Sequence, residues 1–176
     1  GNNFRIRPED KILNAFATNG PGDLRTPVSL DTIIEDGEPV PFINKWIVGP
    51  VDQVDNRRVQ DPNVPMLRYA DVLLMHAEAI NETGSTADAI PFLNQVRERA
   101  GLAPTTASSQ AEVRQAIRDE RMVEFAFEGL RYHDLVRWGE ALNEIEELTD
   151  PDKIIWPIIA REIDLNPNLL PQNPGY

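Results

Sequence analysis

The chain has 176 residues, enough for one domain with a core, and its 41% hydrophobic and 26% charged residues are typical of a globular protein. Its formal net charge of −12 excludes the basic surface that phosphate recognition requires, so we predict no nucleic-acid partner. The chain has no cysteine, which excludes disulfides, thiolate metal sites and a cysteine nucleophile. No apolar run is long enough to span a membrane.

The first segment, residues 1–65, is divided by turn signals: NGPGD, RTP, EDGEPVP, VGPVD and QDPNVP. It predicts a loop-rich segment with one short helix and at most two short strands. The helix is expected where Pro8 suits a first helical position and Ile12 and Phe16 recur at helical spacing before Asn19. The opening GNNFRIRPEDK lacks the apolar core of a signal peptide, so either the protein is cytosolic or the natural N-terminus lies upstream.

The second segment, residues 66–146, predicts four helices in two hairpins. Apolar residues recur at i, i+3, i+4 and i+7 from Met66 to Ile80, and a second such pattern ends at Gly101. A third helix is expected over 110–128 and a fourth over 130–146, with Gly129 between them.

The first hairpin fits the tetratricopeptide pattern. Ala77 and Ala89 permit close helix approach and Gly84 permits the turn. The second hairpin fits poorly, and two repeats are fewer than a stable solenoid needs. We therefore expect the rest of the stack to lie in missing sequence or to be replaced by the irregular segments.

The last segment, residues 147–176, contains five prolines that exclude a long helix. Its apolar run IIWPI requires burial, which predicts an extended strap that wraps the helices. The fold class expected for residues 1–176 is a single, mainly α domain: tetratricopeptide-like hairpins with a loop-rich N-terminal segment and a C-terminal strap.

The third helix carries charge on its apolar side. At 100° per residue, Glu120 and Glu124 fall inside the stripe that Val113 and Ile117 define. Because an unpaired buried charge is unfavourable, these carboxylates must meet arginines. We predict an interhelical ion-pair network made by Arg97, Glu120, Glu124 and Arg131, with Tyr132 and Trp138 packed beside it.

The same stretch has two chemical alternatives. Glu120 and Glu124 as the acid–base pair of a carbohydrate-active enzyme would need a raised pKa, whereas nearby arginines favour ionised carboxylates. His133 with Asp134 and Glu128 as a metal site would lack a second histidine, and adjacent helical residues point apart. No GxSxG, Walker, GxGxxG or HExxH motif is present. We predict no catalytic residue, no metal and no cofactor.

The three tryptophans are candidate sugar-stacking residues. Trp138 and Trp156 each lie in apolar runs, which favours core positions. Trp46 lies in the loop-rich segment, where binding residues concentrate, and is the ligand-binding residue that we predict.

Four ordered stretches carry a resemblance: LRYADVLLMHAEAINETG, LNQVRERAGL, IRDERMVEFAFEGLRYHDLVRWG and IIWPIIAREIDLNPNLLPQNPGY. Together they resemble the C-terminal half of the SusD/RagB family. The triplet Asp23-Leu24-Arg25 resembles the family's Asp-x-Arg element, and Lys45-Trp46 its Lys-aromatic position.

The resemblance implies a non-enzymatic protein on a tetratricopeptide-type fold that binds glycans, or in some members peptides. It implies a lipid-anchored protein of the Bacteroidetes outer membrane, exposed at the cell surface. The partner would be a SusC-like TonB-dependent transporter that imports the ligand. The lipobox cysteine and first repeats of the family have no counterpart in this chain, so membrane association would depend on an N-terminal lipid anchor outside it. The alternative is a helical-repeat scaffold that binds a protein or peptide without glycan affinity.

Overall fold

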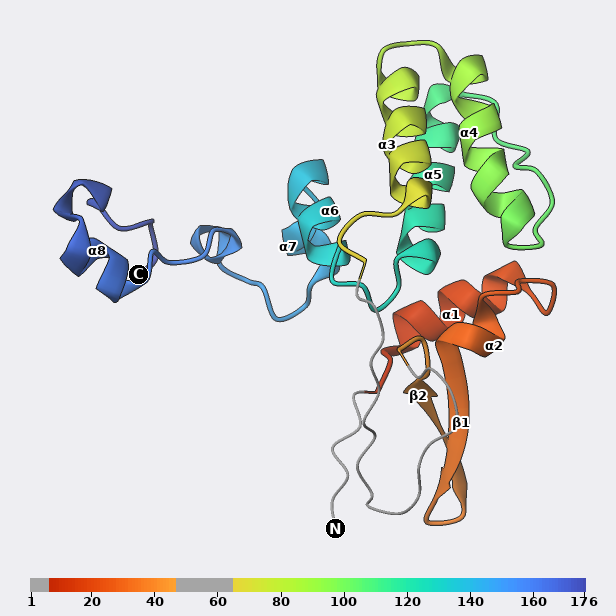
Figure 1. Cartoon of the computed structure of the whole chain (residues 1–176), viewed down its shortest axis with the longest axis horizontal. Helices are drawn as coiled ribbons and strands as arrows, with labels where there is room; N and C mark the ends of the chain where they lie inside the picture. Colours follow the sequence, from red (N-terminus) through yellow and green to blue (C-terminus); the bar gives the residue numbers. More distant parts are fainter. Residues whose placement is uncertain (1–6, 47–64) are drawn as a thin grey trace. The chain divides into compact units, whose positions relative to one another are not determined.

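The computed structural model describes residues 7–46 and 65–176, which form two compact units, Gly1–Glu128 and Gly129–Tyr176 (Figure 1). Trp46 is the last described residue before the gap, and the predicted turns VGPVD and QDPNVP fall wholly or mostly outside the described residues. The elements of the first unit are α1 (Asp10–Asn19), α2 (Thr26–Ser29), β1 (Leu30–Glu35), β2 (Glu38–Ile43), α3 (Tyr69–Glu82), α4 (Thr86–Arg99) and α5 (Gln110–Glu124). Those of the second are α6 (Arg131–Trp138), α7 (Ala141–Glu144), the 3-10 turn η1 (Pro151–Ile154), α8 (Ala160–Leu165) and the 3-10 turn η2 (Pro167–Leu169).

The N-terminal segment holds more regular structure than its turn signals indicate. The expected helix is present as α1, which Gly20 ends with a φ of 78°, and a second short helix, α2, follows. β1 and β2 pair antiparallel from Leu30 opposite Ile43 to Glu35 opposite Glu38. Asp36 and Gly37 both have positive φ, as a two-residue hairpin turn requires. The two prolines of β2 are tolerated because a two-stranded sheet has only edge strands.

α3 and α4 form the predicted first hairpin and pack side by side, with α5 against both (Figure 1). Ala77 and Ala89 are fully buried, and Gly84, with a φ of 97°, lies in the turn between the helices. The small residues therefore lie where the repeat pattern places them. Leu74, Leu93, Val113 and Ile117 fill the space between the three helices.

α5 starts with a complete capping box. The Ser109 hydroxyl accepts from the Glu112 N–H, and the Glu112 carboxylate accepts from the Ser109 N–H at 2.9 Å. Hydrogen bonds from the backbone of Ser109 and Ser108 lower the pKa of Glu112 to about 2. Two reciprocal hydrogen bonds join the start of α5 to the end of α3: the Asn81 side chain donates to the Gln110 carbonyl, and the Gln110 side chain donates to the Asn81 carbonyl. Together these bonds fix the direction of α5.

The later elements depart from the four-helix prediction. α5 ends at Glu124 rather than near 128, and Phe127 and Gly129 both take positive φ before α6. The fourth predicted helix is broken at Gly139, with a φ of 73°, into α6 and α7. Left-handed residues end helices, so the run 110–146 is three helices instead of two. Because α6 belongs to the second unit, the pairing of α5 with α6 as a hairpin stays a prediction. The organisation of the chain as a single domain also stays a prediction.

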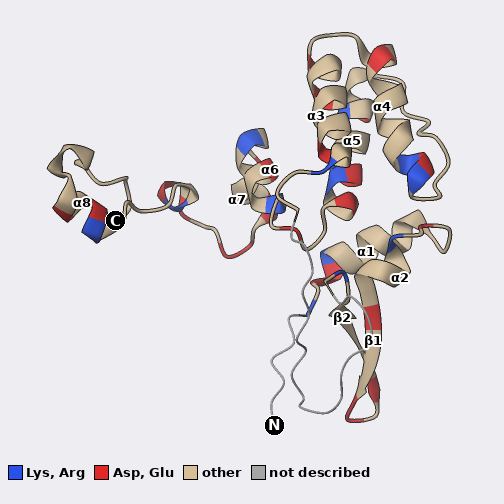
Figure 2. Cartoon of the chain, in the orientation of Figure 1, with Lys and Arg blue, Asp and Glu red and all other residues tan. Residues whose placement is uncertain are grey.

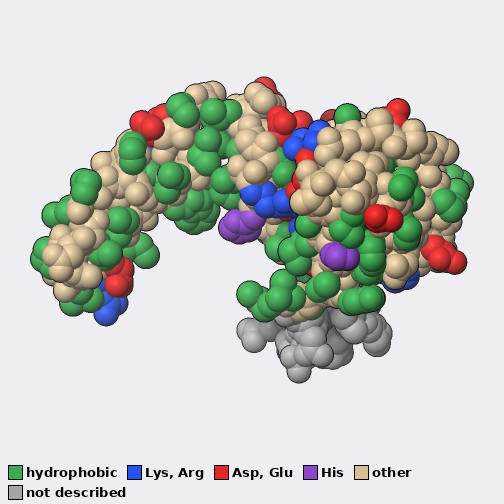
Figure 3. Space-filling view, turned by 90° about the horizontal axis from the view of Figure 1, so that it is seen from above, with side chains coloured by type: hydrophobic (Ala, Val, Ile, Leu, Met, Phe, Trp, Pro, Cys, Tyr) green, Lys and Arg blue, Asp and Glu red, His purple; other side chains and the backbone are tan. Residues whose placement is uncertain are grey.

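The C-terminal segment is not a continuous strap. Prolines start η1 and η2, and α8 lies between them. Gln172 bonds both the N–H and the carbonyl of Ile158, and Asn173 bonds the Trp156 carbonyl, so the segment closes on itself. Hydrophobic side chains cover much of its surface, at the left of Figure 3. Trp156 is 73% exposed, and the burial of IIWPI against the helices stays a prediction.

Candidate functional site

Charged residues gather where α5 ends, beside the start of α3 (Figure 2). We call this group the charged cluster. Its members are Asp23, Arg25, Lys45, Arg68, Arg97, Arg99, Glu120, Glu124 and Glu128.

Glu120 lies one turn before the end of the helix, with 1% of its side chain exposed. Its two oxygens accept from different arginines: Oε1 from Arg25 at 2.6 Å and Oε2 from Arg97 at 3.0 Å. The carboxylate therefore bridges α4 to the segment that precedes α2. Both oxygens are satisfied, as a buried carboxylate requires.

The Glu124 carboxylate pairs with three arginines of the cluster. Oε1 lies 2.8 Å from Arg68 and 2.5 Å from Arg99, and Oε2 lies 3.1 Å from Arg25. Burial alone would raise the pKa of Glu124, but the Arg68 hydrogen bond and the charges of Arg99 and Arg68 outweigh it and leave that pKa below 4.5. A general acid needs a raised pKa, so Glu124 is suited to holding arginines rather than to donating a proton.

The Asp23-Leu24-Arg25 triplet forms a fork-to-fork pair. Arg25 donates from Nε and Nη2 to the two Asp23 oxygens at 2.9 and 2.8 Å, and its backbone N–H donates to Oδ1. Burial acts to raise the pKa of Asp23, and the Arg25 bonds and charge more than reverse this. For Arg25, burial acts to lower the pKa, and the Asp23 and Glu120 carboxylates raise it above its ordinary value. The triplet presents a charged, oriented guanidinium to α5.

Lys45 and Trp46 fasten the backbone that follows α5. Lys45 Nζ lies 2.5 Å from Glu128 Oε1 and donates to the carbonyls of Glu124 and Ala126. Trp46 Nε1 donates to the Phe127 carbonyl at 2.9 Å. The last carbonyls of a helix have no partner within it, so these two side chains act as a cap supplied by a distant segment.

A second buried ion pair lies next to the cluster. Arg121 donates to Asp71 at 2.7 Å, which joins α5 to α3. The guanidinium carbons of Arg68 and Arg121 each lie 4.9 Å from the centroid of the Phe125 ring. Cation–π contact of this kind helps to hold arginines in a fixed position.

The structure brings together three of the four residues predicted for the network. Arg97 pairs with Glu120, and Glu124 accepts from other arginines. Arg131 lies in the second unit, where it pairs with Glu144 at 3.3 Å, and its part in the network stays a prediction. Its guanidinium carbon also lies 5.8 Å from the centroid of the Trp138 ring. The left-handed residues after α5 explain why its periodicity does not extend to Arg131.

Sequence reasoning missed the arginines that hold Glu124. The sequence patterns predict no contact of Arg25, Arg68 or Arg99 with this carboxylate, although all three pair with it. Helical periodicity indicates which side of α5 a carboxylate faces, but not which distant cation meets it. The only signal available was the adjacency of Asp23 and Arg25, and it does not reveal a contact to Glu124, 99 residues away.

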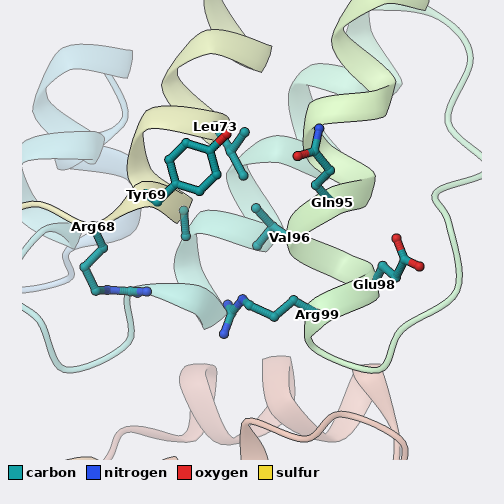
Figure 4. Close-up of a pocket in the computed structure, with 8 residues that line it drawn as sticks. Arg68, Tyr69, Leu73, Gln95, Val96, Glu98 and Arg99 are labelled. Atoms are coloured by element: carbon teal, nitrogen blue, oxygen red, sulfur yellow. The ribbon is translucent and has the colours of Figure 1, made fainter.

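A pocket of about 430 Å³ opens beside the charged cluster, between α3 and α4 (Figure 4). Leu73 and Val96 form its apolar floor, and the guanidinium groups of Arg68 and Arg99 point toward one another at one end. The other lining residues are Tyr69, Ala70, Gln95 and Glu98. The pocket has an aromatic wall and polar groups at its edge, which suits binding more than chemistry.

The sequence did not favour a metal site at His133, Asp134 and Glu128. Within residues 7–46 and 65–176, no group of three or more His, Cys, Asp or Glu side chains is arranged to hold a metal ion. Asp134 instead pairs with Arg137 at 2.8 Å. Over the same residues, no helix is both long and apolar enough to cross a bilayer.

Comparison with known proteins decides the family. The model of the SusD family matches residues 36–152, which include β2 and α3 to α7. The chain belongs to the SusD family.

Individual SusD-family proteins agree with this assignment. The SusD-like protein P38 of Formosa agariphila is 38% identical over 130 residues, covering 67% of this chain and 25% of its own length. The starch-binding protein SusD of Bacteroides thetaiotaomicron is 30% identical over 191 aligned positions, covering 97% of this chain and 33% of its own. A crystal structure of a SusD superfamily protein from Bacteroides vulgatus superposes with a TM-score of 0.75 at 25% identity, covering 97% of this chain and 44% of that one. The chain thus spans a quarter to a third of the curated relatives' length.

Proposed function

We propose that the chain forms part of a non-catalytic nutrient-binding protein that captures an oligosaccharide for a TonB-dependent transporter. The observation that carries the proposal is similarity to the starch-binding protein SusD over 97% of this chain. The matched part of the chain includes the segments that carry the charged cluster. The proposed location is the outer-membrane surface, with a lipid anchor outside these 176 residues.

The geometry supports binding by loops on a fixed helical platform. Lys45 and Trp46 are tied to the backbone after α5, and Arg25 ties the segment before α2 to the same helix. Ion pairs among buried groups hold these segments in one arrangement, and fixed segments lose less entropy when a ligand binds. We propose Trp46 as a sugar-stacking residue: its Nε1 is occupied by Phe127, and stacking on a sugar would use its ring face.

The test is a titration of the full-length polypeptide that contains these residues with maltooligosaccharides and with β-glucan oligosaccharides, by calorimetry. We expect saturable binding of one of these two classes of oligosaccharide. Trp46→Phe removes the Nε1 donor and keeps an aromatic face; Trp46→Leu removes both. Weakened binding in Trp46→Leu but not in Trp46→Phe would support stacking by this ring, whereas equal loss in both would assign Trp46 a structural role.

The scaffold alternative makes a different prediction. An exposed apolar surface on α3, with Tyr69 72% and Val72 49% exposed, is the observation that favours it. If the full-length polypeptide binds no oligosaccharide but retains a transporter or a peptide in a pull-down, the scaffold is the function and glycan capture is rejected.

A further inference from the structure

The charged cluster holds more positive than negative side chains. Five of its members are arginines or lysine and four are carboxylates. The neighbouring pair of Arg121 with Asp71 is neutral. With every group ionised, the cluster therefore carries one excess positive charge, in a chain whose formal net charge is −12. A positive charge that no carboxylate of the cluster matches is met either by water or by an anion from outside.

The excess charge is most accessible at Arg99. The side chain of Arg99 is 56% exposed, whereas the other four cationic side chains of the cluster are between 8% and 25% exposed. Within residues 7–46 and 65–176 its ion pair is with Glu124, a carboxylate that it shares with Arg25 and Arg68. A guanidinium has five N–H donors, so Arg99 has donors left for a second acceptor.

Arg99 lies at one end of the pocket of about 430 Å³ between α3 and α4 (Figure 4). Leu73 and Val96 form the apolar floor of this pocket, and Tyr69 supplies an aromatic ring. One turn beyond the floor, the rings of His76 and Phe92 are in contact, with centroids 4.5 Å apart, and join the two helices. The pocket therefore has the size that small ligands occupy, with its positive charge at the end away from these two rings.

The remaining polar groups of the pocket are acceptors. Gln95 and Glu98, both on α4, place an amide and a carboxylate at its rim. The Glu98 carboxylate points away from the guanidinium groups of Arg68 and Arg99, so it does not occupy them (Figure 4). Amide and carboxylate oxygens accept hydrogen bonds from hydroxyls. The pocket thus matches a ligand with a carboxylate on one side, hydroxyls on another and an apolar ring face toward Tyr69.

We propose that this pocket binds a sugar that carries a carboxylate, that is, a hexuronic acid residue, with the carboxylate on Arg99. Arg68 adds positive charge at the same end, while its own donors are held by Glu124 and Glu128. The site is formed by residues other than Trp46 and is a second binding position. That the ligand is a sugar rests on the proposed function, whereas the need for a carboxylate rests on Arg99 and on the charge balance of the cluster.

The test is calorimetric titration of the full-length polypeptide with methyl β-glucuronide and with methyl β-glucoside. The two ligands differ only in that a carboxylate replaces a hydroxymethyl group. Because a charge-assisted bond to arginine is available to the glucuronide alone, we expect it to bind at least about tenfold more tightly at low salt. The preference should shrink as the salt concentration rises, since Arg99 is exposed.

Variants assign the preference to the pocket. Arg99→Gln removes the charge, and we expect the preference for the glucuronide to be lost. Arg114→Gln is the matched control, because it makes the same change at an arginine that pairs with Glu82 and does not line the pocket. Since Arg99 also contacts Glu124, Gln95→Glu is the second variant: it leaves the cluster unaltered, adds a negative charge to the pocket and should weaken glucuronide binding with Tm unchanged.

Three results would overturn the proposal. The first is no measurable preference for the glucuronide over the glucoside. The second is a preference that survives both Arg99→Gln and Gln95→Glu, which would place the carboxylate elsewhere. The third is binding of N-acetylalanine as tight as that of the glucuronide, which would assign the pocket to the carboxyl end of a peptide. Maltooligosaccharides and β-glucan oligosaccharides carry no carboxylate, so if they bind and the glucuronide does not, only this proposal fails and glycan capture stands.

Discussion

α3 and α5 pack against each other, yet they distribute polarity in opposite ways. α5 buries Glu120, Arg121 and Glu124 and exposes polar residues such as Gln115. α3 buries Leu74 and Ala77 and also exposes Tyr69, Val72 and Met75. Buried charge on α5 is satisfied within this unit, because each carboxylate meets at least two arginines. Exposed apolar surface on α3 has no such partner among the described residues.

The contrast separates two kinds of departure from simple amphipathic patterning. A buried ion-pair cluster connects segments far apart in the sequence and fixes their arrangement; removing one partner is strongly unfavourable. An exposed apolar face has little influence on the unit that carries it, but it specifies where another element packs. The buried ion pairs therefore stabilise this unit itself, whereas the exposed apolar side of α3 is a surface on which another element could pack.

The largest effect is expected at the centre of the charged cluster. Glu124→Ala leaves Arg25, Arg68 and Arg99 without their shared carboxylate, and we expect a loss of about 3–5 kcal/mol in the free energy of unfolding. Urea denaturation of the 176-residue chain measures this. The control is Glu82→Ala, which removes an exposed pair with Arg114 and should cause a much smaller loss. A Glu124→Ala chain as stable as the unaltered one would show that the cluster does not hold the fold.

The next effect concerns pH. The folded-state pKa values of Asp23 and Glu124 lie below their ordinary values of 3.8 and 4.5, so the unfolded chain takes up protons first on acidification. The stability that these groups contribute is fully present above pH 4.5 and is lost as pH falls through the lowered pKa values. Unfolding midpoints in urea between pH 7 and pH 3 should stay level at first and then drop. Asp23→Asn should flatten the drop, and an unchanged slope in that variant would contradict the assignment.

A smaller effect is expected where Trp46 caps the end of α5. Trp46→Phe keeps an aromatic ring and removes the donor to the Phe127 carbonyl, so we expect a loss of about 1 kcal/mol. Hydrogen exchange of the amides at 125–129 should increase, because this segment is fastened by Trp46 and Lys45. No change in either measurement would show that the Trp46 bond contributes nothing to the segment.

Much of this arrangement could be predicted from local pattern. Periodicity and turn residues predicted α1, α3 and α4, and the inward position of Glu120 and Glu124 followed from their place on the apolar stripe. The partners could not be predicted, because Arg25 and Arg68 reach α5 from segments whose positions no local rule specifies. The helical periodicity of α5 does not extend to Arg131, because residues 127 and 129 take positive φ before α6. Trp156 shows the same limit, as hydrophobicity indicates a need for burial without naming the surface that provides it.

The smallest expected effect is that of Val72→Ala, and it gives the sharpest test of the contrast when the same substitution is also made on α5. Val113 on α5 is fully buried, and Val72 on α3 is 49% exposed. Val113→Ala removes buried methyl groups and leaves a cavity, so we expect a loss of about 2 kcal/mol in the 176-residue chain. Val72→Ala should change stability by less than about 0.5 kcal/mol, since an exposed side chain has little packing to lose and alanine favours the helix. Equal losses at both sites would mean that the outward side of α3 is already covered within this chain, and the contrast would no longer hold.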